Sequence, residues 1–394
     1  MVLATSACSR CSAPNAPASS STGATNTPTT PRPPIIEVHG HIGATAYEEA
    51  LALADENGIE RIVNLSGGNQ ARGLERHVAA MKRHPGRIAV FFNVPWQFHQ
   101  DPRFAAEIPA AMERAVLAGY AGLKVPKALG LSVPGPNGGF LAVDDPSLDS
   151  IWAKAGELGI PVSIHTGDPK AFFEPITPQN ERIEELGEAP NWSFADPKYP
   201  RRETLLAQRD NLLARHRNTT FILVHFANNP EDIDYVDRLL DENPNANVDV
   251  SARLAEIGRH NPDKVRRLFI KHKDRILFGS DLGVHVRKRK GSTPELSLFL
   301  GSLTKGDPPT RASVKTFYDR HWTFFESDHR DTGTIPHPVP IQGNWAIRPI
   351  SLPEDVLRAV YHDNAYRLIF APHFARQGVS DPLLKKKTNV TLDP

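Results

Sequence analysis

Cysteine is nearly absent from this chain of 394 residues. Its two cysteines, Cys8 and Cys11, both lie near the N-terminus. The rest of the chain therefore cannot form a disulfide framework or a thiolate metal site. Cys8-Ser-Arg-Cys11 has no further cysteine or histidine pair nearby, which makes it a poor metal motif.

Long apolar runs and an excess of charge of one sign are also missing. No apolar stretch reaches the roughly 18 residues expected of a membrane helix. Lysine and arginine number 46 against 45 acidic residues, a formal net charge of +1. No global field then favours nucleic acid or an anionic membrane. We read the basic runs at 287–290 and 385–387 as solvated surface, and we expect a small-molecule partner. A homo-oligomer is compatible with the sequence.

The N-terminal residues 1–34 have the composition of a tail. From Ser12 to Pro34 the chain is rich in Ser, Thr, Ala, Pro and Asn, and it has no apolar periodicity. We predict that this tail is disordered, because it cannot bury enough apolar surface. Met1-Val2-Leu3-Ala4 is too short for the apolar part of a signal peptide, so we expect a cytoplasmic protein. Export with a lipid-anchored Cys8 is the alternative.

Beyond Pro33, apolar runs of strand length alternate with amphipathic segments of helix length. This rhythm predicts a parallel sheet with right-handed crossovers, and a count of eight favours a (β/α)₈ TIM barrel over a doubly wound sheet. We predict one α/β domain over 35–371, with a long insertion at about 285–350 after strand eight. Residues 372–394 would form a C-terminal tail. The predicted strands are 35–41, 61–66, 87–92, 120–125, 161–165, 220–225, 246–250 and 275–279.

Metal-capable residues occur where these strands end. His39 and His41 share one face of the first strand, because side chains alternate along a strand. His165 ends strand five, His225 ends strand six, and Asp281 follows strand eight. A single such histidine is more often structural, and a chain with 16 histidines can contain His-x-His by chance. Several at one barrel mouth would cost several kcal/mol if buried unpaired, which favours a metal site.

In this order, the strand-end motifs make the chain similar to the metal-dependent amidohydrolase superfamily. The resemblance is to its amidohydrolase-related branch of hydrolases and non-oxidative decarboxylases, and it spans about 35 to 370. The motifs are Glu37-Val38-His39-Gly40-His41, Gly122-Leu123-Lys124, Ile164-His165-Thr166-Gly167, Val224-His225, Leu277-Phe278-Gly279-Ser280-Asp281 and Asp363-Asn364-Ala365-Tyr366-Arg367-Leu368.

The resemblance implies metal ligation by His39, His41, His165 and Asp281, with His225 beside a metal-bound water. This donor set suits one divalent ion, Zn²⁺ above all, with Mn²⁺ as the alternative. The metal would lower the pKa of the water and polarise a carbonyl. Asp281 would accept the proton of the water and return it to the leaving group, while His225 would orient the water or the oxyanion.

Three further residues need separate interpretation. The family usually has aspartate where this chain has Glu37, whose longer side chain would keep the charge next to the ligands. Lys124 occupies a position that is carbamylated in binuclear relatives, but this branch commonly keeps an unmodified lysine, so we expect one metal. Lys124 would then bind substrate or form a salt bridge at the barrel mouth. Arg253 would hold a substrate carboxylate in its guanidinium fork, or it would point outward at the start of a helix.

These features predict a metal-dependent hydrolase of a small molecule with a C–N or C–O bond to a carbonyl. A metal-dependent non-oxidative decarboxylase (carboxy-lyase) on the same site is the alternative, in which Asp281 handles the proton at carbon. The two share their ligands, so motifs do not separate them. A catalytically silent binding barrel is a third hypothesis, which the intact ligand set disfavours.

Overall fold

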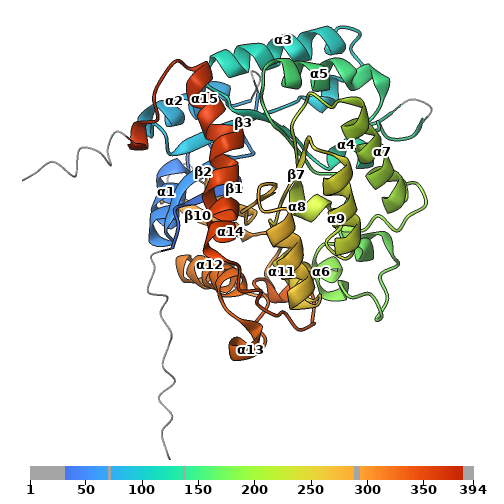
Figure 1. Cartoon of the computed structure of the whole chain (residues 1–394). Coiled ribbons are helices and arrows are strands. Elements are labelled where there is room, and N and C mark those ends of the chain that lie inside the picture. Colours follow the sequence, from blue (N-terminus) through green and yellow to red (C-terminus); the bar gives the residue numbers. More distant parts are fainter. Residues whose placement is uncertain (1–31, 70–71, 136–137, 288–292, 385–394) are drawn as a thin grey trace, which may run out of the picture. The chain divides into compact units, whose positions relative to one another are not determined.

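The computed structural model describes residues 32–69, 72–135, 138–287 and 293–384 (Figure 1). Of these, the residues from Pro33 onward form one compact unit. Nearly all of the predicted tail 1–34, including Cys8 and Cys11, lies outside the described residues, as do positions 288–290 and 385–387 of the basic runs. Within the described ranges, every helix is too short or too polar to cross a lipid bilayer.

A ten-stranded, mostly parallel sheet organises the fold, which confirms the α/β class. Its order is β10-β9-β1-β2-β3-β4-β5-β6-β7-β8, and the pairing of β9 with β10 is antiparallel. Each of the eight predicted strands is present, and successive ones pair in parallel from β1 to β8. The bounds are β1 Ile35–Ile42, β2 Ile59–Asn64, β3 Ile88–Asn93, β4 Gly122–Val125, β5 Val162–Ile164, β6 Phe221–Leu223, β7 Ala246–Asp249, β8 Ile276–Leu277, β9 Leu282–Arg287 and β10 Glu295–Leu300.

The sheet curls until the chain that follows β8 lies beside β1. The Val38 backbone N–H donates to the Phe278 carbonyl at 3.1 Å, and the Asp281 N–H donates to the His39 carbonyl at 3.0 Å. Beyond this point β9 pairs in parallel with β1. His39 and Asp281 are therefore brought together by main-chain hydrogen bonds between segments far apart in the sequence.

Helices follow the strands and lie around the outside of the curled sheet (Figure 1). Helix α9 illustrates how the sequence produces them: the Asp232 carboxylate caps it by accepting from the Tyr235 N–H, and Ile233, Val236 and Leu239 bury one face. The longer helices between the strands are α1 Tyr47–Glu56, α2 Leu74–Arg83, α3 Phe104–Leu117, α5 Asp149–Glu157, α7 Arg202–Arg215, α9 Ile233–Glu242 and α11 Pro262–Lys271, and the shorter ones are α4 Ala128–Leu131, α6 Ile183–Glu188, α8 Val224–Ala227 and α10 Leu254–Gly258.

Two apolar layers hold the sheet, because its strands are buried on both faces. Alternate residues such as Val63 and Leu65 belong to an inner cluster that also contains Phe370 and Phe374 from the C-terminal helices. Ile62, which directly precedes Val63, packs in the outer layer against the helices. Because side chains alternate along a strand, neighbouring residues of β2 belong to different layers.

The chain after β8 carries its own elements over the region expected to be an insertion. The hairpin of β9 and β10 is followed by α12 (Arg311–Glu326) and α13 (His329–Thr332), before α14 (Glu354–Arg358). Aromatic side chains of α12 pack against Phe278, whose ring centroid lies 5.0 Å from that of Trp322. The aromatic run in this segment therefore packs the insertion against the end of β8.

The C-terminal segment differs from the expected tail. Residues Ala371–Arg376 form helix α15, Phe374 is buried, and Asp381 pairs with buried Arg61 at 2.7 Å. Arg61 is almost fully enclosed, so its guanidinium requires an anionic partner. The folded unit consequently extends past position 371 to at least Asp381, and positions 385–394 lie outside the described residues.

Candidate metal centre

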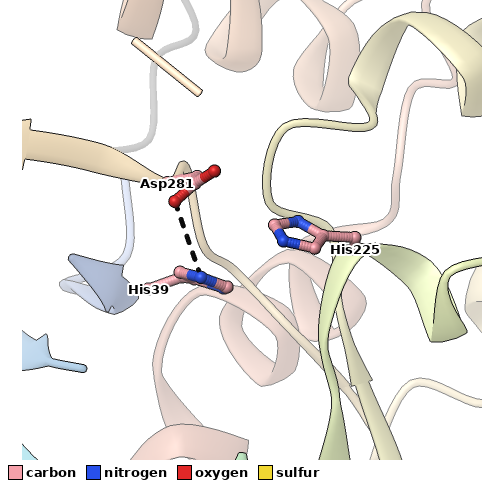
Figure 2. Close-up of side chains that lie close together, drawn as sticks. All are labelled: His39, His225 and Asp281. Atoms are coloured by element: carbon pink, nitrogen blue, oxygen red, sulfur yellow. Dashed lines mark ion pairs between the residues drawn. The ribbon is translucent and has the colours of Figure 1, made fainter. Parts of the chain in front are cut away.

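Three metal-capable side chains converge at the carboxyl end of the sheet. His39 comes from β1, His225 follows β6, and Asp281 lies between β8 and β9 (Figure 2). One potential ligand atom from each lies within 4.8 Å of the others. The Nε2 atom of His39 is 3.6 Å from Asp281 Oδ1, the pair joined by the dashed line in Figure 2.

The ring of His39 is oriented by buried partners behind it. Its Nδ1 lies 2.8 Å from Asp249 Oδ2 and 2.8 Å from the Ser251 hydroxyl. A carboxylate only accepts hydrogen bonds, so Nδ1 carries the proton and the Nε2 lone pair faces the centre. Burial lowers the pKa of His39, and the nearby Lys124 lowers it further, against the opposing effect of Asp249. The ring is therefore neutral, the form that binds metal ions.

His225 presents its Nε2 in the same way, from an unusual backbone. Its Nδ1 lies 2.9 Å from the Ser251 carbonyl, which can only accept, and its main-chain N–H donates to Asp249 Oδ1 at 2.8 Å. Its φ of 56° begins a left-handed run that continues through Asn228. Such residues cost of order 1–2 kcal/mol each in other proteins. Burial lowers the pKa of His225 well below its usual value, with His165 and Arg253 contributing.

The left-handed turn is tied to the loop after β5. The Asn228 carboxamide oxygen accepts from the Thr166 N–H at 3.0 Å, and its nitrogen donates to the Gly167 carbonyl at 3.3 Å. Arg202 donates both to the Asp168 carbonyl and to the Asn228 carbonyl. The positions of His165 and His225 are therefore coupled through one hydrogen-bond network.

Asp281 is the anionic member of the centre. Its carboxylate oxygen Oδ1 lies 3.3 Å from His41 Nε2, while His41 Nδ1 lies 2.7 Å from the Ser66 hydroxyl. Burial opposes ionisation, but His39, His41 and Lys124 together lower the pKa of Asp281 to about 2. The carboxylate is thus ionised at neutral pH. His41 is at the site, as the sequence predicts, and it faces Asp281.

His165 is close to the centre but has a different first partner. Its ring lies 4.5 Å from that of His225, centroid to centroid, and its Nε2 is 3.2 Å from Asp168 Oδ1. The other Asp168 oxygen accepts from Lys127 Nζ at 2.6 Å. The most compact donor group therefore contains His225, to which the sequence analysis assigned a role beside the water, while the predicted ligand His165 faces a carboxylate.

An open cavity of about 290 Å³ adjoins the centre. Lys124 forms part of its wall, and its ammonium nitrogen is buried with no hydrogen-bond partner among the described residues. Burial lowers the pKa of Lys124 to about 8, although Asp249 and Asp281 act in the opposite direction. The cavity is lined by His41, Lys124, Pro126, Lys127, His165, His225, Asp281, Gly283, His285 and Phe299.

Arg253 and Glu37 occupy structural positions beside the centre. Arg253 is buried, donates to the Ala252 carbonyl at 2.7 Å, and has its Nε 3.8 Å from the Glu256 carboxylate. Its guanidinium therefore lies inside the fold, where its Nε has no hydrogen-bond partner among the described residues. Glu37 accepts from the main-chain N–H groups of His39 and Ser280, both at 2.9 Å. Burial raises the pKa of Glu37 to about 7, and these hydrogen bonds oppose the shift.

Asp249 and Ser251 are site residues that sequence reasoning missed. Asp249 ends β7 at the same edge as the histidines, so the strand-end rule that selected His165 and His225 also applied to it. Ser251 gave no comparable signal, because an isolated serine after a strand is common. Its hydroxyl lies within 3.0 Å of the Nδ1 atoms of both His39 and His225.

The residues present fit a divalent metal ion. Two neutral imidazoles have their Nδ1 atoms engaged and their Nε2 lone pairs free, and an ionised carboxylate lies within reach of both. This is the donor chemistry of zinc sites, including the carboxylate behind a ligating histidine. A second group, called the surface group, consists of exposed Asp241, half-buried Asp237 and buried His272, and Lys271 bridges its two aspartates. That group is accounted for as a solvated ion-pair network.

Comparison with known proteins gives a family and several distant structures. The sequence profile of the family described as amidohydrolase matches residues 43–370, which include His165, His225 and Asp281 and begin just after His41. No curated protein sequence matches the chain significantly.

Three similar solved structures each have low sequence identity to this chain. A 2,6-dihydroxybenzoate decarboxylase from Rhizobium is 18% identical over 63% of this chain and 88% of that chain, with a TM-score of 0.41. An uncharacterized TIM-barrel protein from Bordetella bronchiseptica is 14% identical over 86% and 99%, with a TM-score of 0.49. A 4-oxalomesaconate hydratase from Rhodopseudomonas palustris is 14% identical over 90% and 99%, with a TM-score of 0.47. At this level of similarity, nothing follows about the reaction.

Proposed function

The chain belongs to the amidohydrolase family, and from that premise we propose that it is a metal-dependent hydrolase of a small carboxylate-bearing molecule. The observation that carries the proposal is the convergence of His39, His225 and Asp281 on one point beside a cavity. We further propose that the curled sheet is a closed (β/α)₈ barrel. The position of the candidate centre supports this, because catalytic groups in such barrels gather at the carboxyl ends of the strands.

His39 and Asp281 are the proposed ligands that sequence and geometry both select. His41, whose Nε2 contacts Asp281, is the third. For the remaining ligand, the family pattern favours His165 and the donor distances favour His225. When bound, a divalent ion such as Zn²⁺ or Mn²⁺ supplies Lewis acidity, lowering the pKa of a water molecule towards 7 and polarising a carbonyl.

The proton chemistry falls to this chain's own residues. Asp281 is ionised at neutral pH, so it can accept a proton from the attacking water and return it to the leaving group. The Nδ1–H of His225 is held by the Ser251 carbonyl, which leaves Nε2 as an acceptor only. If His165 is the remaining ligand, His225 is thus suited to orient the water, and it has no proton at Nε2 to donate to an oxyanion.

Lys124 supports the choice of a carboxylate substrate. A buried ammonium without a partner is costly, and a substrate carboxylate in the cavity would supply the missing counter-charge. The cavity volume of about 290 Å³ suits a small molecule. Arg253, the other candidate for this role, is not among the residues that line the cavity, so it is the weaker one.

The same lysine favours a second candidate function, non-oxidative decarboxylation. A carboxylate held by Lys124 would lie in the cavity that Asp281 also lines, where that aspartate could manage the proton at the carbon that loses carbon dioxide. Hydrolysis and decarboxylation then differ in their product. The metal-loaded protein should be assayed against lactones, amides and aromatic carboxylates, with carbon dioxide release recorded separately.

Variants test whether the centre is the source of activity. His39→Ala and Asp281→Asn should lose bound metal, measured by elemental mass spectrometry, and should lose turnover while remaining folded. His272→Gln, which alters the surface group, should retain both. Comparing His165→Gln with His225→Gln would decide which of the two is a ligand. Wild-type metal content in His39→Ala would overturn the proposed function.

A further inference from the structure

A tyrosine from the insertion reaches the framework of the proposed metal centre. Tyr318 lies on α12 and is almost fully buried. Its hydroxyl donates to Glu37 Oε2 at 3.1 Å and lies 3.1 Å from the Ser280 hydroxyl. A side chain from the segment after β10 is thereby connected to β1 and to the residue immediately before Asp281.

Glu37 extends that connection to both proposed ligands. Its Oε1 accepts from the main-chain N–H of His39 and from that of Ser280, each at 2.9 Å. The Asp281 N–H in turn donates to the His39 carbonyl. One carboxylate thus sets the spacing between the backbone segments that carry His39 and Asp281. The added methylene of glutamate relative to aspartate lets one oxygen reach these amides while the other meets Tyr318.

The tyrosine is itself firmly held. Its ring stacks on Trp322, with centroids 5.6 Å apart and an interplanar angle of 12°, and it lies 6.4 Å from the Phe278 ring. Aromatic contacts of this kind add to the burial of each ring. The hydroxyl therefore has a defined position from which it can restrain the flexible Glu37 side chain.

We propose that Tyr318 is a positioning residue for the His39–Asp281 pair and acts through the carboxylate of Glu37. This inference rests on the proposed metal-dependent function. It gives the insertion a role in the site: α12 supplies the hydrogen bond that keeps Glu37 in the rotamer joining β1 to the end of β8. Partners of this kind behind metal ligands typically change affinity by 10–100-fold when removed.

The test is Tyr318→Phe, with Tyr361→Phe as the matched control. Tyr361 belongs to the same aromatic cluster, 5.6 Å from Phe278, but its hydroxyl donates to Glu326. We expect Tyr318→Phe to bind zinc at least about 10-fold more weakly in chelator competition. Its kcat should fall, while its KM should stay within about two-fold of the wild-type value. Tyr361→Phe should match the wild-type zinc affinity. Equal zinc affinity in the two variants would overturn the inference.

Two further measurements isolate the route through Glu37. In a double-mutant cycle, Tyr318→Phe should have no further effect on zinc affinity in a Glu37→Gln background, and fully additive losses would contradict the proposal. Amide hydrogen exchange in metal-free protein should be faster at His39 and Ser280 in Tyr318→Phe than in Tyr361→Phe. Unchanged exchange would overturn this inference, whether or not the wild-type protein binds zinc. A wild-type protein that binds no zinc would instead refute the proposed function.

Discussion

Asp249 and His39 form the buried hydrogen bond on which the centre depends. The two atoms, Asp249 Oδ2 and His39 Nδ1, are 2.8 Å apart, and the other Asp249 oxygen accepts the His225 N–H at the same distance. Burial works against ionisation of Asp249, but His39 and the surrounding hydrogen-bond donors hold its pKa below the usual value. One carboxylate therefore orients two members of the donor group.

Asp249→Asn should weaken metal binding by about 10–100-fold, because the carboxylate that fixes the His39 tautomer is lost. Chelator competition would measure the affinity, and circular dichroism would confirm that the variant is folded. Asp241→Asn, in the surface group, serves as the control and should bind as wild type does. If Asp249→Asn kept full affinity, the orienting role of Asp249 would be wrong.

Lys124→Met should make the protein more stable and less active. It removes a buried ammonium without a partner, so we expect the free energy of unfolding to rise by about 1–3 kcal/mol, while KM for carboxylate substrates rises. Lys127→Met should instead lower the free energy of unfolding, because it removes the cation that pairs with buried Asp168. Urea denaturation measures both changes. A Lys124→Met protein less stable than wild type would show that the ammonium is already paired.

Gly279→Ala should destabilise the fold by about 1–3 kcal/mol through overpacking. An added Cβ at Gly279 would lie 3.0 Å from the Cβ of His39 and 3.3 Å from Val38, so it presses directly on the first proposed ligand. Gly187→Ala is the control: no heavy atom lies within 4 Å of its added Cβ, and it should be neutral or slightly stabilising. Thermal denaturation distinguishes the two, and equal melting temperatures would exclude the crowding predicted at Gly279.

The buried His77 should make stability fall with acidity. Burial lowers its pKa to about 4 in the folded protein, where its Nδ1 lies 2.6 Å from the Tyr47 hydroxyl. The unfolded chain takes up the proton near pH 6.5, so stability is lost as the pH falls from 6.5 towards 4, by about 2 kcal/mol between 6.5 and 5. Urea denaturation at several pH values should show that the free energy of unfolding changes less with pH in His77→Gln than in the wild type. An unchanged pH dependence of the free energy of unfolding would mean that His77 also titrates normally in the folded state.

Much of the fold and part of the site follow from local patterns. Apolar runs of strand length and the helical segments between them predict the eight parallel strands, because each strand must bury both faces. That order places the ends of strands one, five, six and eight at one edge, and with them His39, His165, His225 and Asp281. Those residues could be chosen as candidates without coordinates.

The C-terminal segment shows where such reasoning fails. Residues 372–394 are predicted to form a tail, yet Asp381 pairs with Arg61 across 320 positions of sequence. The pairing is decided by the need to satisfy a buried guanidinium, and that need arises only after the strand carrying Arg61 has been enclosed.

The sequence by itself determined the class of fold, the family and the donor types at the strand ends, because periodicity and motif order are local properties. Only the tertiary structure decided which histidine nitrogens face the centre. The bond between His39 and Asp249 spans 210 positions, and the network of Tyr318, Glu37 and Ser280 joins an insertion to the first strand. Such contacts depend on how the sheet curls and on which buried groups remain to be satisfied, and no local pattern contains either.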